Sequence, residues 1–403
     1  MQILVAKDNR TYLGNDDFEL VERKGVGHPD TICDAIAERA SSDYSKYCIE
    51  TFGKPAHHWF DKVMLIGGEA DVDYGIGKIT KPYKVIFAGK VSYHVGTKRI
   101  PVEDILYKSA VCVLEEVLTG FDAKCHLVVV NELVDYQGSG RGTSRYQPSS
   151  VEALPSLNNP ELVSNDSNLL SAYAPLTTLE SLVLLVERFV NGKDFKMRNP
   201  DTGWDVKVLG NRFLDHYELL LNMPFLAKDI HSMEEYLQRK QDVYDEITKF
   251  ISEKFDIKVH LMMNATDRNG RPYLTALGSV ADTGDVGVVG RGNRMNGLIT
   301  PMRPMSIEAP AGKTPIDHTG KIYGVVANEI VYEVYKAIKM PVEVYIFTAK
   351  ESRLNNPDRV IVKVINFTDE EREKKIIEQI VKEQFDNIGH VSEKIIYDRI
   401  VMW

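Results

Sequence analysis

The sequence predicts an α+β protein built from three similar domains, and its length and an internal repeat are the two observations behind this prediction. A chain of 403 residues is too long for one ordinary hydrophobic core. Residues 121–127 and 255–261 read FDAKCHL and FDIKVHL and agree at five of seven positions. Each copy follows an amphipathic helical pattern, and each strand pattern runs on to an asparagine, Asn131 or Asn264. An internal structural repeat explains this better than chance, and repeated use of one common packing unit is the alternative.

A weaker third copy of the helix-then-strand unit is predicted at residues 319–338 and 342–347. Three such units account for the length of the chain. We place the first domain at residues 1–136, the second at 137–263 and the third at 264–403. The domains are free to exchange segments, so these boundaries are approximate.

Hydrophobic spacing, caps and turn residues place the remaining elements. A capping box of Thr177 and Glu180 opens one helix, and Asp30 is a candidate N-cap for another. Residues 137–167 are rich in Gly, Ser, Pro and Asn and are predicted to form a long functional loop. The other predicted helices span residues 30–47, 102–118, 232–255 and 369–385, and the other predicted strands begin at residue 63 or span residues 84–93, 124–130 and 359–365.

Composition is that of a soluble globular protein, with 43% apolar and 27% charged residues. A net charge of −9 argues against a general nucleic-acid or membrane-surface binder. The four cysteines form no C-x-x-C pair, so neither a disulfide framework nor a zinc site is indicated. The first residues lack the apolar segment of a signal peptide, and no apolar run is long enough to span a membrane. We therefore expect a cytoplasmic protein.

Four stretches carry candidate chemistry. The first is residues 22–30, ERKGVGHPD, which joins a charged cluster to the start of a helix. A helix N-terminus favours anions such as phosphate. His28 can donate to a developing negative charge, and Asp30 can hold a divalent ion that bridges phosphate oxygens. Simple capping by Asp30 and a turn at His28 are the structural alternative.

The second stretch is Ser139, Gly140, Arg141, Gly142, Thr143 and Ser144, whose glycines let backbone N–H groups converge on an anion. Residues 281–294 are the third and mix carboxylates, glycines and two arginines, which suits a loop that holds Mg-nucleotide. Without a clear βαβ context they are not a dinucleotide fingerprint. The fourth, residues 310–318, contains Gly-Lys-Thr, but the glycine that a Walker A loop requires is absent, as Ile307 stands there.

Each of these stretches alone is equally consistent with an ordinary loop. Together they predict a polyphosphate with a divalent metal bound among several loops, because one ligand explains basic, acidic and glycine-rich stretches at once.

These motifs resemble those of the S-adenosylmethionine synthetases, specifically the divergent archaeal type, over nearly the whole chain. The most specific are Gly27-His28-Pro29-Asp30, Gly67-Gly68-Glu69, residues 139–144, Asn165-Asp166, and the loops at 281–294 and 312–317. The resemblance implies synthesis of S-adenosylmethionine from ATP and L-methionine: the methionine sulfur attacks C5′ of ATP, and the expelled triphosphate is hydrolysed to pyrophosphate and phosphate. It also implies three α+β domains around a pseudo-threefold axis, with mixed sheets covered by helices on one face.

The resemblance assigns roles to individual residues. It implies that His28 donates to the leaving oxygen, that Arg291 and Lys313 are cationic clamps, and that Asp30 and Asp317 hold Mg²⁺. It further implies that Asp166 and Asp282 orient adenosine and the methionine ammonium group, that Glu69 contacts methionine, and that Ser139, Gly140, Arg141, Gly142, Thr143 and Ser144 bind the ATP phosphates. K⁺ is expected without an assigned ligand, and active sites are expected between the two subunits of a homodimer.

The sequence departs from the bacterial and eukaryotic pattern at Thr31, where that pattern has a lysine. It also lacks an obvious second lysine after Lys313, for which Lys321 is a speculative substitute, and Lys207 is only a loose match to a further phosphate lysine. Two other functions stay open on the sequence: a different Mg-ATP transferase such as a ligase or kinase, and a nucleotide-binding sensor that has lost the reaction.

Overall fold

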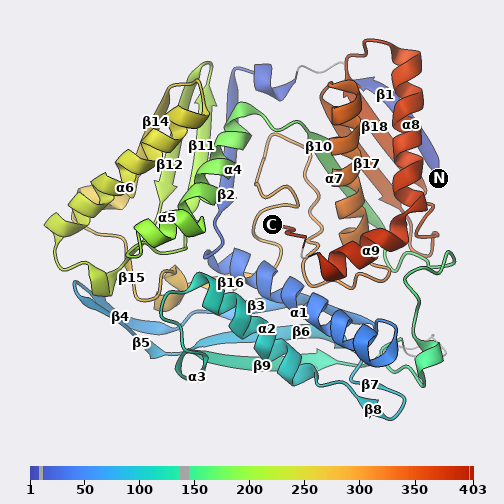
Figure 1. Ribbon diagram of the computed structural model, residues 1–403, viewed down its shortest axis with the longest axis horizontal. Helices are drawn as coiled ribbons and strands as arrows, with labels where there is room; N and C mark the ends of the chain where they lie inside the picture. The colour runs from blue at the N-terminus through green and yellow to red at the C-terminus, as the bar shows by residue number, and fades with distance from the viewer. Residues whose placement is uncertain (9–11, 137–144, 399) are drawn as a thin grey trace.

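Three four-stranded sheets of one topology form the frame of the molecule in the computed structural model, which describes residues 1–8, 12–136, 145–398 and 400–403. Each sheet is mixed, and helices lie along it (Figure 1). The first sheet has the order β16 (Val286–Val288), β3 (His58–Ile66), β6 (Tyr83–Val91), β9 (Leu127–Val134); the second β2 (Phe18–Lys24), β11 (Lys207–Phe213), β12 (His216–Asn222), β14 (Val259–Met263); the third β10 (Asn168–Ala174), β17 (Val342–Thr348), β18 (Arg359–Ile365), β1 (Gln2–Asp8).

Strand directions repeat from sheet to sheet. In each sheet the two central strands pair antiparallel, a third strand joins one side antiparallel, and a fourth joins the other side parallel. The two strands that begin within the sequence repeat, β9 and β14, both take the parallel edge position. The predicted α+β class with three similar units is thereby confirmed, while the pseudo-threefold axis stays a prediction.

The edge strands come from distant parts of the chain. β1 and β2 lie at the N-terminus but complete the third and second sheets. β16 returns from residues 286–288 to the first sheet, and β10 from residues 168–174 to the third. Strands therefore cross between the predicted units, which is the exchange of segments that the sequence left open.

Helices cover one face of each sheet, because their apolar stripes and the inward side chains of the strands bury one another. They are α1 (Pro29–Phe52) and α2 (Val102–Val117) on the first sheet, α4 (Thr178–Val190) and α6 (Met233–Lys254) on the second, and α7 (Thr319–Ile338) and α8 (Glu370–Asp386) on the third. Smaller elements are α3 (Ala123–His126), α5 (Lys193–Arg198), β4 (Glu69–Asp73), β5 (Ile76–Lys81), β7 (His94–Val95), β8 (Lys98–Arg99), β13 (Phe225–Leu226) and β15 (Leu274–Thr275).

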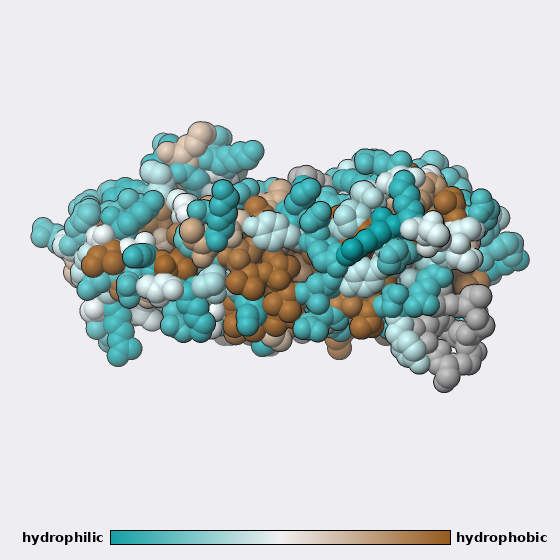
Figure 2. Space-filling model, turned by 90° about the horizontal axis from the view of Figure 1, so that it is seen from below, coloured by the Kyte–Doolittle hydropathy of each residue, from teal (hydrophilic) through white to brown (hydrophobic). Residues whose placement is uncertain are grey.

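The opposite face of the first sheet carries apolar side chains that none of the described helices covers. Val288, Met64, Ile86 and Val130 stand side by side across its four strands. Met64 is 39% exposed, and Val286 and Val128 beside this row are more exposed still. Figure 2, which views the molecule from below, has apolar surface gathered in the middle of the face.

Some predictions of individual helices and strands are confirmed and others are wrong. The capping box of Thr177 and Glu180 is confirmed, and the strand at residues 359–365 and the helices at 102–118, 232–255 and 369–385 are found within a residue or two. The strand predicted at 124–130 is wrong at its start, since the Asp122 side chain caps the short helix α3 and the strand begins at Leu127. Helix α9 (Ile388–Tyr397), which packs on α1, was not predicted. No helix within the described ranges is long and apolar enough to cross a membrane.

Candidate active site

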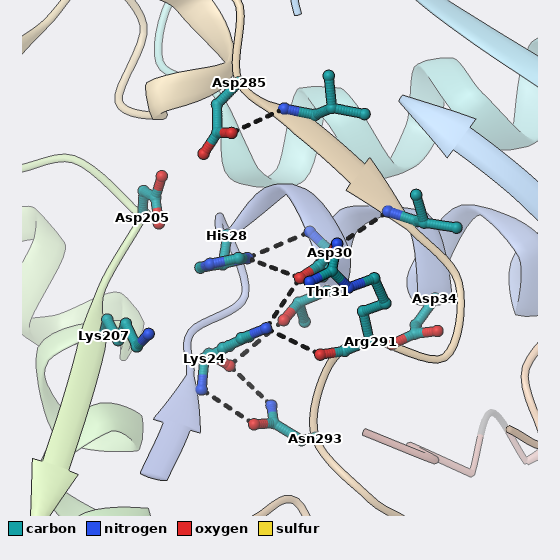
Figure 3. Close-up of polar contacts among 12 residues, drawn as sticks. Lys24, His28, Asp30, Thr31, Asp34, Asp205, Lys207, Asp285, Arg291 and Asn293 are labelled. Atoms are coloured by element: carbon teal, nitrogen blue, oxygen red, sulfur yellow. Dashed lines mark hydrogen bonds and ion pairs between the residues drawn. The ribbon is translucent and has the colours of Figure 1, made fainter. Parts of the chain in front are cut away.

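The loop before α1 is pressed against the second sheet. Gly25 N–H donates to Val206 O at 2.6 Å, and Gly27 N–H donates to Trp204 O at 3.1 Å. A side chain at Gly27 would meet the Trp204 backbone at 2.5 Å, so glycine permits this close approach. The approach brings the start of α1 beside Asp205 and Lys207 (Figure 3).

His28, rather than Asp30, is the N-cap of α1. Its Nδ1 accepts a hydrogen bond from the Asp30 backbone N–H at 3.2 Å, which corrects the capping role considered for Asp30. Since Nδ1 is an acceptor, the neutral ring carries its proton on Nε2. Burial first, and the positive charge of Lys24 second, lower the pKa of His28 to about 4. At neutral pH the ring is therefore an uncharged donor whose far side faces Asp205 and Lys207 (Figure 3).

Positive charges surround His28 and Asp30. Lys24 Nζ donates to Asp30 Oδ2 at 2.9 Å and to the backbone oxygen of Arg291 at 2.8 Å. Lys207 pairs with Glu22 at 3.0 Å on the neighbouring strand. The Arg291 side chain is exposed and forms no ion pair within the described ranges. This group, Lys24, His28, Asp30, Lys207 and Arg291, is called the His28 half below, and its cations together with the helix N-terminus favour an anion.

Three carboxylates on one face of α1 hold the loops that follow. Asp30, Asp34 and Glu38 lie four residues apart and accept from the backbone N–H groups of Val288, Gly290 and Gly312, at 3.0, 2.9 and 3.0 Å. A helix brings residues at this spacing onto one side. The loops at residues 286–292 and 310–313 are thus fixed along α1 by charge-assisted hydrogen bonds.

Gly287 is where β16 touches α1, and we expect its replacement to be costly. A Cβ there would lie 2.0 Å from Pro29 O and 2.2 Å from Pro29 C, both backbone atoms. Gly287→Ala should lower the free energy of unfolding by about 3 kcal/mol, measured by urea denaturation. Gly120→Ala is the control, since nothing lies within 4 Å of its Cβ position and only its φ of +82° is unfavourable, at about 1 kcal/mol. Equal losses in the two variants would contradict the close contact.

A second group of predicted residues gathers beyond the middle of α1. Lys313 Nζ lies 2.8 Å from both Asp61 and Glu308. Burial alone would lower its pKa, but these two carboxylates raise the pKa of Lys313 above its ordinary value. Asp317 pairs with Arg145 at 3.0 Å, and burial raises the pKa of Asp317 to about 6 against the lowering effect of Arg145. Lys313, Asp317 and Arg145 are called the Asp317 half below.

The two halves are well separated within one chain. Ser41 Oγ donates to Lys313 O at 3.0 Å, and Ser41 is eleven residues after Asp30 on α1. Eleven residues of helix span about 16 Å. The same separation follows along β3, whose Met64 pairs with Val288 and whose Trp59 pairs with Lys313. The His28 half therefore lies at the start of α1 and the Asp317 half beside its middle.

Of the remaining predicted residues, Asp166 lies beside the Asp317 half, because its backbone oxygen accepts from the Thr319 hydroxyl at 3.3 Å. The others lie apart from these groups or outside the described ranges. Asp282 is 0% exposed, and both of its oxygens are engaged, by the Tyr83 hydroxyl and the Leu277 N–H. Burial raises the pKa of Asp282 to about 6. Glu69 is exposed and pairs with Lys81 at 2.7 Å, and Asp166 accepts from the Ser167 N–H at 2.9 Å. Residues 139–144, predicted to bind phosphate, lie outside the described residues.

Some of the grouped residues were missed from the sequence. The bacterial pattern has a lysine directly after the aspartate, where this chain has Thr31. Here Lys24 brings an ammonium group to Asp30 instead, and no sequence spacing predicted this role for Lys24. The acidic residues at 30, 34 and 38 repeat with helical spacing and were a usable signal. Lys321, the speculative substitute for the second lysine, is 0% exposed and its ammonium lies 2.7 Å from Glu38, so its role stays a prediction.

Comparison with known proteins adds three similarities. A family model described as S-adenosylmethionine synthetase (AdoMet synthetase) matches residues 1–399. The S-adenosylmethionine synthases of Pyrobaculum aerophilum and Aeropyrum pernix are 36% and 38% identical, the first over 100% of both chains and the second over 96% of this chain and 95% of the relative. In fold, an unusual S-adenosylmethionine synthetase from Campylobacter jejuni is similar at a TM-score of 0.58 and 13% identity, covering 94% of this chain and 93% of that one.

Proposed function

We infer the working of the site from one premise: the chain belongs to the S-adenosylmethionine synthetase family, and it makes S-adenosylmethionine from ATP and L-methionine. In this reaction the methionine sulfur attacks C5′ of ATP, the C5′–O bond breaks with its electron pair leaving on oxygen, and the triphosphate so released is hydrolysed. The assignment of individual residues to these events is our proposal.

The observation that carries the proposal is the uncharged, hydrogen-bonded state of the His28 ring. A neutral ring whose Nδ1 is held by the start of α1 offers Nε2–H as a fixed donor. We assign this donor to the bridging oxygen on which charge grows as the C5′–O bond breaks. Lys24, Lys207 and Arg291 lie around it and stabilise the departing triphosphate, so charge neutralisation and positioning supply most of the catalysis.

Divalent metal is a family requirement, and Mg²⁺ is our proposal for it. Asp317 fits as a ligand, because its Oδ1 is buried without a hydrogen-bond partner in the described chain. Asp30 fits less freely, since Val288 N–H and Lys24 already engage its oxygens, but each oxygen has a second lone pair. Within the described ranges no three acidic, histidine or cysteine side chains are grouped so that they could hold a metal ion, so the metal would rely on substrate phosphates for further ligands, as Mg²⁺ commonly does. K⁺ is proposed without a ligand.

We also propose that the other predicted residues contact the substrates. Arg291 and Lys313 remain the proposed cationic clamps, Glu69 the proposed contact to methionine, and residues 139–144 the proposed phosphate loop. Asp166 and Asp282 are proposed to orient adenosine and the methionine ammonium group. For Asp282 this requires one oxygen to exchange the Tyr83 hydroxyl or the Leu277 N–H for substrate.

A homodimer with shared active sites is our proposal for the assembly. The uncovered apolar face of the first sheet supports it, since a second copy of the same face would bury these side chains. In such a two-fold interface the same patch faces itself. The His28 half lies at one end of β3 and the Asp317 half at the other, so an axis through the middle of the sheet would oppose unlike halves of two subunits.

The reaction itself is tested by incubating the purified chain with ATP, Mg²⁺ and K⁺, with and without L-methionine, and identifying products by mass spectrometry. We expect S-adenosylmethionine, pyrophosphate and phosphate only when methionine is present. ATP turnover without a sulfonium product would favour another Mg-ATP transferase. ATP binding without turnover would favour a nucleotide sensor.

The lowered pKa of His28 predicts a pH profile. A histidine with the ordinary pKa of about 6.5 would change from the charged to the uncharged form as the pH rises through that value. His28 instead stays uncharged down to about pH 4. We expect the ratio of kcat between wild type and His28→Ser to stay constant from about pH 5.5 to 8. The ratio should fall only at lower pH, where a second proton on Nδ1 would also remove the cap. A step in this ratio near pH 6.5 would contradict the assignment.

A further inference from the structure

Unpartnered polar atoms gather around Asp317. The buried atoms without any hydrogen bond in the described chain include His57 Nδ1, Trp59 Nε1, Asp317 Oδ1, and both side-chain atoms of Asn165. Asn165 is 7% exposed and Asp317 is 4% exposed. Buried polar groups are nearly always paired, so several unpaired ones in one place indicate a missing partner.

The four residues come from three segments that meet at one loop. Asn165 N–H donates to Asp317 O at 3.2 Å, so the two residues are neighbours. His57 Nδ1 lies 4.0 Å from Asp317 Oδ1, too far for a direct hydrogen bond. Trp59 pairs with Lys313, and its ring centroid lies 5.7 Å from that of His318.

The chemistry of these atoms restricts the missing partner. The Trp59 indole and the Asn165 amide present N–H groups, which require acceptor oxygens or nitrogens. Asp317 Oδ1 and the amide oxygen require a cation or a donor, while Arg145 already occupies the other oxygen of Asp317. A metal-bound polyphosphate supplies acceptor oxygens and a cation together, which matches a set of donors placed beside one carboxylate.

We propose that Asn165, His57 and Trp59 form, with Asp317, the receptor for the distal end of the metal-bound triphosphate, with Asn165 as its central contact. The proposal rests on the proposed function and adds three residues that neither the sequence motifs nor the family resemblance assigned to a ligand. An adenine ring, which also pairs donors with acceptors, is the competing occupant.

Asn165→Leu tests the proposal, because leucine has nearly the same shape and no polar atoms. The probes are inorganic tripolyphosphate with Mg²⁺ and, separately, adenosine, titrated into the full-length protein by calorimetry. We expect the Kd for tripolyphosphate to rise at least about tenfold with adenosine binding unchanged. The Tm of the ligand-free variant should stay equal or rise, because replacing an unpaired buried amide by an apolar group removes an unsatisfied polar group. Asn158→Leu, an exposed change seven residues earlier, is the control and should change neither binding nor Tm.

Each contrary outcome has a distinct meaning. If Asn165→Leu binds tripolyphosphate as tightly as wild type, the proposal is overturned. If adenosine binding is then weakened instead, the site belongs to the adenine base. A clear fall in Tm also overturns it, because the amide is then paired within the protein or by a second subunit. Failure of the wild-type protein to bind tripolyphosphate or ATP would instead contradict the proposed function.

Discussion

His28→Ser is expected to lower kcat for S-adenosylmethionine formation about 100- to 1,000-fold, which is the usual effect of removing one preorganised donor to a developing oxyanion. Serine is a good N-cap, so its hydroxyl can replace Nδ1 as acceptor for the Asp30 N–H and keep the start of α1. What it cannot replace is the Nε2–H on the far side of the ring. The measurement is single-turnover product formation at saturating substrates, with ATP affinity determined separately.

The control for this change is His28→Asn. Asparagine also caps helices, and its amide can donate, although from a shorter side chain. We expect it to lose only about tenfold in kcat. ATP should bind both variants within about twofold of wild type, since Lys24, Lys207 and Arg291 are untouched. Wild-type turnover by His28→Ser would show that His28 is only a cap.

Asp30→Asn and Asp317→Asn are each expected to lower kcat at least about 100-fold, although the two residues belong to separate halves of the site in one chain. Each substitution keeps the shape of the side chain and removes the charge proposed to hold Mg²⁺ against the triphosphate. The loss should be partly recovered by raising Mg²⁺, which a purely structural defect would not allow. Asp43→Asn, on α1 and paired with Arg39, is the control and should stay within about twofold. A normal rate in either Asp30 or Asp317 variant would remove that residue from the metal site.

Much of the fold was readable from the sequence because local signals there agree with the final structure. The sequence repeat marks β9 and β14, which take the same edge position in two sheets. The capping box at Thr177 and Glu180 opens α4 as predicted. Which strand completes which sheet was not readable, because β1, β2, β10 and β16 pair with strands far along the chain, and hydrophobic periodicity carries no information on partners.

The site, like the fold, could be predicted only in part from the sequence. The motif around His28 predicted a helix start with an imidazole and a carboxylate. That His28 is the N-cap could be seen only from the 3.2 Å hydrogen bond between its Nδ1 and a backbone N–H. Lys313 and Asp317 were found as candidates, but their separation from His28 follows from the length of α1 and the course of β3. Trp59 drew no attention in the sequence, because only burial without a partner distinguishes its indole.

The most direct test of the central claim, that each active site combines the His28 half of one subunit with the Asp317 half of another, is a mixed dimer. Asp30→Asn and Asp317→Asn chains carrying different affinity tags are co-expressed, and dimers that carry both tags are purified. One of the two sites in such a dimer then has both halves intact, so we predict about half of the wild-type activity from two nearly inactive parents. A dimer of His28→Ser with Asp30→Asn, both in the same half, should stay inactive. Mixed Asp30/Asp317 dimers as inactive as their parents would contradict the shared site.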